Sequence, residues 1–236
     1  MRRAMLLSLD ALFAATVLFV GGHFLLSSEP LRRPLVKWLG AQGFVTVYSL
    51  AVTGALLWMG VAYSAAPALP VWTPPPELTW IPLVVLPFAS ILVVAGLTTR
   101  SPTVVGGERF GSSLDDPAPG VLRITRHPFL WGTALWAASH LLVNGDLASI
   151  TVFGGFLVLC LGGMRHIDQK REASMGAQWG PVKLTTSAIP FAALIAGRTH
   201  MDWAGIGWWR PLAGIVLYLV LLGTHPWLIG VTALPV

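Results

Sequence analysis

Long apolar runs, each close to the length that crosses a lipid bilayer, constrain this chain more than any other feature. We predict helices at 5–26, 43–66, 80–97, 128–143, 147–164 and 211–230, with a marginal seventh segment at 187–197. Only 11% of the residues are charged and 55% are hydrophobic, whereas about a quarter of a soluble domain is charged. The sequence therefore predicts an all-α fold, a polytopic membrane bundle of about six transmembrane helices.

The whole chain, residues 1–236, is expected to form a single transmembrane domain, because six spans and their short loops account for its length. The first apolar run resembles a signal peptide. However, Asp10 and His23 interrupt it and no small-residue cleavage site follows, so we expect it to be retained as the first helix.

The basic residues alternate between loops. Three lie at 27–42, four at 98–127 and four at 165–186, and none lies at 67–79 or 144–146. By the positive-inside rule this pattern predicts a multi-pass membrane protein with cytoplasmic basic loops, both termini on the far side and the lipid bilayer as its partner. Because the positive charges are dispersed, they do not form the basic face that nucleic-acid binding requires.

The sequence predicts the local structure of two of the loops between these helices. The 67–80 loop holds five prolines together with Trp72 and Trp80, which predicts an extended segment with tryptophans at the membrane interface. Asn144-Gly145-Asp146 predicts a tight turn in which Asp146 caps the following helix. The helices on either side of that turn are therefore expected to form an antiparallel hairpin.

Residues 120–146 carry Arg123, Arg126, His127 and His140 into an apolar segment. An ionisable group at membrane depth costs about 2.5–3.5 kcal/mol on insertion scales, so such groups usually face a bundle interior and serve a ligand or ion. We therefore expect a functional site here. The single cysteine, Cys160, cannot form a thiolate cluster, so a metal would have to use histidine.

Four histidines on three predicted helices are candidate ligands. They are His23, His127, His140 and His225. Two imidazoles from separate helices are the arrangement that a b-type haem needs, and Trp131 and Trp136 are candidates for its aromatic walls. His127 and His140 are 13 residues apart, about 20 Å along one helix, and cannot share an ion. The plainer interpretation places His23 at the interface and His127 at a helix start facing lipid headgroups.

Three stretches carry a resemblance to a known family: Arg123-Ile-Thr-Arg-His-Pro128, Trp136-Ala-Ala-Ser-His140 and Thr186-Ser-Ala-Ile-Pro-Phe-Ala-Ala193. Over nearly its whole length the chain resembles the NnrU family, bacterial membrane proteins associated with denitrification and nitric oxide metabolism and related to plant 15-cis-zeta-carotene isomerase. The resemblance implies a haem b protein that acts as a redox or isomerase-like enzyme, or as an assembly factor. Its implied partners are a nitric oxide reductase or haem-handling proteins.

The resemblance implies that His23 and His140 are the axial ligands of the haem iron, with His127 also matched. A cysteine proposed as an alternative ligand in the isomerase is Ala137 here, which favours the NnrU function over carotenoid cis-trans isomerisation. Hydropathy places His23 near one membrane face and His140 towards the other. Two other ligand pairs therefore stay open, namely His23 with His127 and His140 with His225.

A second resemblance involves Arg126-His-Pro-Phe129 and the stretch from Glu172 to Trp179. These residues are similar to membrane isoprenylcysteine and phospholipid methyltransferases, and imply S-adenosylmethionine held by Arg126, His127 and Glu172. Residues 165–198 are expected to form a cytoplasmic lid over the Arg-His-Pro sequence. Arg123 and Arg126 suit either a haem propionate or a lipid phosphate, because a guanidinium binds both anions.

Overall fold

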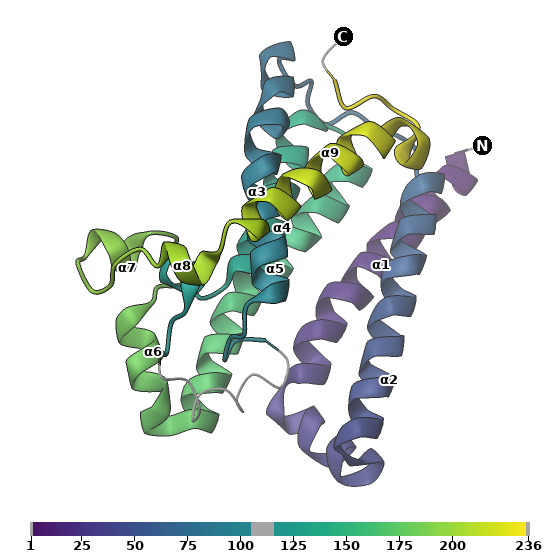
Figure 1. The fold of residues 1–236 in the computed structure, drawn as a ribbon. Coiled ribbons are helices and arrows are strands. Elements are labelled where there is room, and N and C mark those ends of the chain that lie inside the picture. Colours follow the sequence, from purple (N-terminus) through teal and green to yellow (C-terminus); the bar gives the residue numbers. More distant parts are fainter. Residues whose placement is uncertain (1, 105–115, 235–236) are drawn as a thin grey trace. The chain divides into compact units, whose positions relative to one another are not determined.

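The computed structural model describes residues 2–104 and 116–234, and this part of the chain is helical with no β-strand (Figure 1). The long helices are α1 (Arg2–Ser27), α2 (Glu29–Ala65), α3 (Trp80–Thr98), α4 (Pro128–Val143), α5 (Leu147–Met175) and α9 (Trp209–Ile229). The short helices are η1 (Pro76–Thr79), η3 (Gly120–Arg123), η4 (Gly176–Gln178), α6 (Trp179–Thr185), α7 (Ala192–Ile195) and α8 (Trp203–Ile206).

All six apolar runs predicted as helices are helical. Within residues 2–104 and 116–234, five stretches are long and apolar enough to cross a membrane: Ser8–Ser27, Glu29–Ala65, Pro76–Thr98, Leu147–Thr185 and Trp209–Ile229. The sixth run forms α4, which has only 16 residues. The marginal 187–197 segment contains only the four-residue α7 and is not a further span. The predicted all-α membrane bundle is therefore confirmed.

Two helices extend further than the sequence predicts. The stretch Glu29–Ala65 consists of two helical segments joined across a kink at Gly40. The second segment begins close to the predicted residue 43, and the first, which the prediction lacks, begins at Glu29 with Pro30 in its first turn. Gly40 has φ 73° and ψ 165°, a conformation that a residue with a Cβ rarely adopts. Helix α5 continues past residue 164 to Met175, so the first part of the expected lid is helical.

The chain divides into two compact units, and the division falls within α4 and α5. One unit comprises residues up to Pro75 together with His140–Leu159. Its core is built from small and aliphatic side chains of α1, α2 and α5, with Phe19: Leu12, Ala15, Phe19, Ala55, Met59, Ala62, Ala148 and Val152. Tyr63 and Ser149 add a hydroxyl hydrogen bond of 2.9 Å between α2 and α5.

The proline-rich loop and the Asn144–Asp146 turn lie side by side in this unit. The backbone amide of Val71 donates to the carbonyl of Gly145 at 2.8 Å, and the amide of Leu147 donates to the carbonyl of Leu69 at 2.9 Å. Asp146 Oδ1 accepts the amide of Ser149 at 2.9 Å and so caps α5 as predicted. The loop is extended only to residue 75, because Pro76–Thr79 forms η1.

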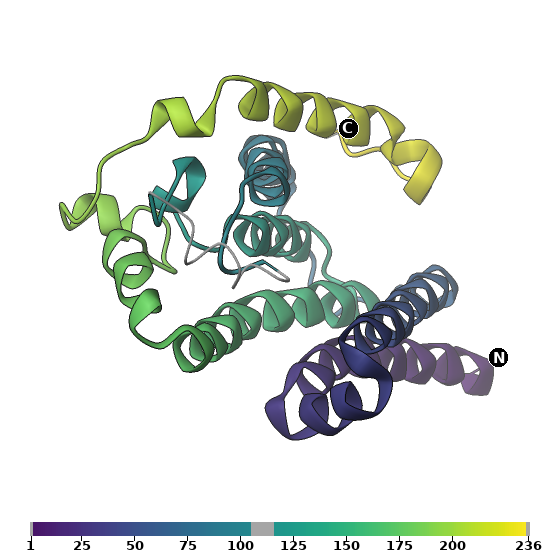
Figure 2. The same ribbon diagram turned by 60° about the horizontal axis from the view of Figure 1, so that its bottom comes forward.

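The other unit comprises Pro76–Ser139 and residues from Cys160 onward. Glycines set the distance between its long helices. A Cβ on Gly132 of α4 would lie 2.6 Å from the carbonyl oxygen of Ala89 on α3, and a Cβ on Gly214 of α9 would lie 2.5 Å from the Cα of Ile91. Helix α9 passes beside α3 in both views of the ribbon (Figures 1 and 2). Close backbone approach at small residues is how membrane helices pack.

Asp202 connects the start of α8 to η3. Its Oδ1 accepts the amide of Gly205 at 2.8 Å and its Oδ2 accepts the amide of Gly120 at 2.7 Å. These hydrogen bonds hold the pKa of Asp202 below its ordinary value, with a smaller contribution from the charge of Arg123 and a small opposing effect of burial. The ionised carboxylate is therefore the form that stabilises this contact.

We expect Asp202→Asn to lower the melting temperature at neutral pH, because an amide replaces one acceptor oxygen by a donor. The native pKa lies below the unfolded value of about 3.9, so the stabilisation is complete above that value and is lost as the pH falls through the native pKa. The difference in melting temperature between wild type and variant should therefore shrink below about pH 4. Circular dichroism melts from neutral to acidic pH measure this, and a difference independent of pH contradicts it.

Candidate functional site

A buried ion cluster joins the start of α4 to the polar part of α5. His127 Nε2 donates to Asp168 Oδ1 at 2.8 Å, and Arg126 donates to Asp168 Oδ2 through Nε at 2.9 Å and through a terminal nitrogen at 2.8 Å. The side chains of His127 and Arg126 are only 1% and 11% exposed. One carboxylate therefore fixes both side chains of the Arg-His-Pro sequence.

The segment after α6 covers this cluster. The amide of Arg126 donates to the carbonyl of Ser187 at 3.0 Å. The carbonyl of Ala188 accepts both the hydroxyl of Thr125 at 3.0 Å and the indole N–H of Trp131 at 2.7 Å. Residues of the 165–198 region thus lie against the Arg-His-Pro sequence, as the lid prediction requires.

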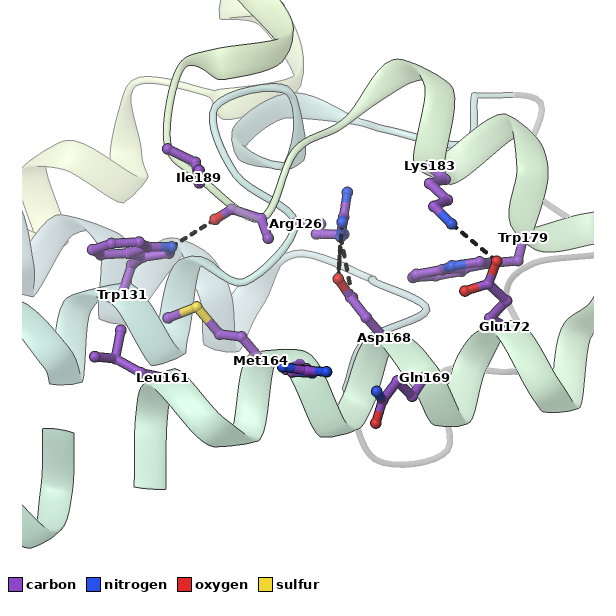
Figure 3. A pocket seen from close by; sticks show the side chains of 12 residues that line it. Arg126, Trp131, Leu161, Met164, Asp168, Gln169, Glu172, Trp179, Lys183 and Ile189 are labelled. Atoms are coloured by element: carbon purple, nitrogen blue, oxygen red, sulfur yellow. Dashed lines mark hydrogen bonds and ion pairs between the residues drawn. The ribbon is translucent and has the colours of Figure 1, made fainter. Parts of the chain in front are cut away.

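A cavity of about 390 Å³ opens beside the cluster (Figure 3). Its walls come from the residues just before α4, from α4, α5 and α6, and from the covering segment: Arg126, Trp131, Leu161, Met164, Arg165, Asp168, Gln169, Glu172, Trp179, Lys183, Ala188 and Ile189. Arg126 lies 6.0 Å from the ring centroid of the buried Trp179, within cation–π range. The cavity therefore combines the guanidinium of Arg126, held by Asp168, with the indole rings of Trp131 and Trp179 and an apolar end.

The methyltransferase resemblance placed Arg126, His127 and Glu172 around one ligand. Arg126 and Glu172 do line one cavity. However, the polar groups of these residues already have partners, because Arg126 pairs with Asp168 and Glu172 accepts from Lys183 at 2.9 Å. His127 directs its Nε2 to Asp168.

His23 and His140 both belong to the unit formed by residues up to Pro75 and His140–Leu159. His23 Nδ1 donates to the carbonyl of Phe19 at 2.7 Å, and its ring lies edge-on to Phe19 with centroids 4.7 Å apart. The ring of Tyr48 lies 6.0 Å away. His140 is half-buried, and its ring lies 5.1 Å from that of Phe153.

The other predicted site residues belong to the second unit. His225 Nδ1 donates to the carbonyl of Val231 at 2.8 Å. Arg123 donates to Asp116 at 2.7 Å and to the carbonyl of Ala118 at 3.1 Å, so it holds a loop. Trp131 and Trp136 are also in this unit. Phe19 and Tyr48 are among the rings next to the His23 imidazole, and Phe153 is among those next to His140.

Asp168 is the residue that sequence reasoning missed. It lies 41 residues after His127, so no short motif joins the two. A signal is nevertheless present, because Arg165, Asp168 and Glu172 recur at helical spacing on the continuation of an apolar run. Such a run of charges resembles a solvated helix end, which is why the pairing is visible only in the structure.

Apolar helices of bilayer-spanning length, with polar side chains clustered at the end of an apolar run, define an all-α integral membrane protein. The chain belongs to the NnrU protein family, whose sequence model matches residues 11–233.

Two plant proteins are similar to part of the chain, and each is named 15-cis-zeta-carotene isomerase, chloroplastic. The protein from Zea mays is 34% identical over 82 residues, which cover 35% of this chain and 22% of the relative. The protein from Arabidopsis thaliana is 34% identical over 79 residues, which cover 34% of this chain and 22% of the relative. The match thus spans about a fifth of the length of these relatives. No solved structure matches the chain.

Proposed function

We propose that this protein is a membrane isomerase-like haem protein in which His23 and His140 would hold the haem iron. The observation that carries the proposal is a chain of aromatic contacts between the two histidines within one unit. His23 contacts Phe19, Phe19 contacts Phe156 with centroids 5.5 Å apart, and Phe153, one turn before Phe156 on α5, contacts His140. The side chains next to both imidazoles are therefore apolar and aromatic, the surroundings that a haem ligand requires.

The donor set fits a haem. Because a carbonyl only accepts, the hydrogen bond to Phe19 places the proton of His23 on Nδ1 and leaves the lone pair of Nε2 for a metal. A Cβ on Gly21 or Gly22 would meet no atom within 4 Å, so the backbone beside His23 is open to a flat ligand. A bound haem would supply a redox-active iron.

The residues of this chain would then act as ligands and walls. His23, held in one orientation by the carbonyl of Phe19, and His140, set against Phe153, would fix the cofactor. Phe19 and Phe156 would exclude water. The relatives are named for a carotene, which supports a lipid-soluble polyene that enters from the bilayer as the substrate class.

The same proposal includes a cellular role. The family resemblance supports an inner-membrane location and a part in nitric oxide or nitrite metabolism. A redox enzyme and an assembly factor for a nitric oxide reductase differ in their expected behaviour. The enzyme turns over alone, whereas the assembly factor co-purifies with its partner and shows no turnover.

Absorption spectra test the proposal. We expect protein purified from haem-replete cells to show a Soret band that shifts and sharpens on reduction with dithionite, with paired visible bands. His23→Ala and His140→Ala should each remove these features, because both imidazoles would be needed to hold the haem iron. The matched control is His200→Ala, whose side chain is exposed and should leave the spectrum unchanged.

A colourless wild-type protein, or spectra unchanged in both ligand variants, contradicts the haem proposal. The alternative cofactor is then S-adenosylmethionine in the cavity lined by Arg126 and Glu172. Calorimetric titration of the methyl donor distinguishes the two, with Glu172→Gln as the variant expected to weaken binding.

A further inference from the structure

The cavity beside Arg126 lies where the chain changes from apolar to polar. Helix α5 is apolar through Met164 and then continues with Arg165, Asp168, Gln169 and Glu172. Both parts of the helix line the cavity. We expect a site at this point of a membrane helix to lie at the depth of lipid headgroups, because charged side chains at helix ends meet the interface.

The two ends of the cavity differ in chemistry (Figure 3). Trp131, Leu161, Met164 and Ile189 lie together at one end, whereas Gln169, Glu172 and Lys183 lie towards the other. Ile189 is 67% exposed and Leu161 is 50% exposed, so apolar surface remains uncovered there. A ligand that fills this cavity therefore needs an apolar part and a polar part.

The charges in the cavity do not cancel. Three cations and two carboxylates line it, and two internal ion pairs, Arg126 with Asp168 and Lys183 with Glu172, use both carboxylates. Within the described residues no carboxylate pairs with Arg165, which is exposed and lies between Met164 and Asp168 on α5. One uncompensated guanidinium therefore lies at the junction of the apolar and polar walls.

We propose that this cavity binds the headgroup of an anionic phospholipid, with the phosphate at Arg165 and the first part of the acyl chains against Leu161 and Ile189. A guanidinium and a phosphate form charge-assisted hydrogen bonds, often two in parallel. The acyl chains would cover apolar surface that is otherwise exposed. The proposal does not depend on haem, because its residues lie in the unit that lacks His23 and His140.

Calorimetric titration in a neutral detergent tests this site with short-chain lipids. We expect dioctanoyl phosphatidylglycerol to bind the wild type about tenfold more tightly than dioctanoyl phosphatidylcholine or inorganic phosphate, and Arg165→Gln to weaken phosphatidylglycerol binding about tenfold. Ile189→Gln should weaken it several-fold through the acyl chains. The matched control is Arg33→Gln, which removes an arginine that is 79% exposed on α2 and should leave binding unchanged.

Two results overturn the proposal. Equal binding of phosphatidylglycerol by Arg165→Gln, Arg33→Gln and wild type shows that the lipid contacts the general surface instead. Inorganic phosphate binding as tightly as the lipid shows a free-anion site. The absorption spectrum of Arg165→Gln, recorded in parallel, separates this outcome from the haem proposal, because the lipid site can fail while the spectrum is intact.

Discussion

Asp168→Ala is expected to lower the free energy of unfolding by about 3 kcal/mol, because it removes the carboxylate that accepts hydrogen bonds from the buried side chains of both Arg126 and His127. His127 is 1% exposed at its side chain and Arg126 is 11% exposed, so neither finds water to replace the lost partner. Asp168 itself is 21% exposed. The expected loss is therefore at the lower end of the range of about 3–5 kcal/mol for breaking a buried ion pair. For a chain of this size the melting temperature should fall by about 6–12 °C.

Asp116→Ala is the matched control for this measurement. It also removes an aspartate paired with an arginine at 2.7 Å, but Asp116 is 39% exposed and Arg123 is 26% exposed. We therefore expect a loss of about 1 kcal/mol or less. Thermal unfolding in detergent, followed by circular dichroism, compares the two variants. If Asp168→Ala melts no lower than Asp116→Ala, the buried cluster does not hold α4 to α5.

Gly132→Ala is expected to lower the free energy of unfolding by about 2–3 kcal/mol, because the new methyl group has no room. Its Cβ would lie 2.6 Å from the carbonyl oxygen of Ala89 and 2.9 Å from the amide nitrogen of Val93. Both are backbone atoms of α3, so the strain is relieved only by moving one helix away from the other. The packing of the neighbouring backbone is then lost along the contact.

Gly60→Ala makes the same chemical change at an open position. Gly60 lies inside α2, and a Cβ there would meet no atom within 4 Å. Alanine in a helix interior gains about 0.5–1 kcal/mol over glycine, so this variant should be as stable as the wild type or slightly more stable. Both variants are compared by thermal unfolding. A melting temperature of Gly132→Ala at or above that of Gly60→Ala would show that α3 and α4 are not in close backbone contact.

The local features of this protein were readable from the sequence. Each of the six long apolar runs became a helix, because hydropathy over about 20 residues depends only on neighbouring residues. The cap formed by Asp146 was predictable for the same reason, since its partner Ser149 is three residues away. The helix extensions at Glu29 and beyond residue 164 were missed, because charged residues next to an apolar run are compatible with either a loop or a solvated helix.

The candidate site was only partly readable. The Arg126-His127 sequence marked one end of it, but the pairing with Asp168 joins residues more than 40 positions apart and leaves no local pattern. The close packing at Gly132 was also not predictable. Nothing in the sequence distinguishes this glycine from the others, and only the structure shows that it contacts the backbone of α3.

The sequence by itself determined the membrane class, the positions of the helices and the residue types available for a site. Only the tertiary structure decided that Asp168 satisfies Arg126 and His127, that Arg165 lines the cavity without a carboxylate partner among the described residues, and that phenylalanines lie next to His23 and His140. The physical reason is that helix formation and hydropathy are local, whereas ion pairing and close packing depend on which side chains the folded helices bring together.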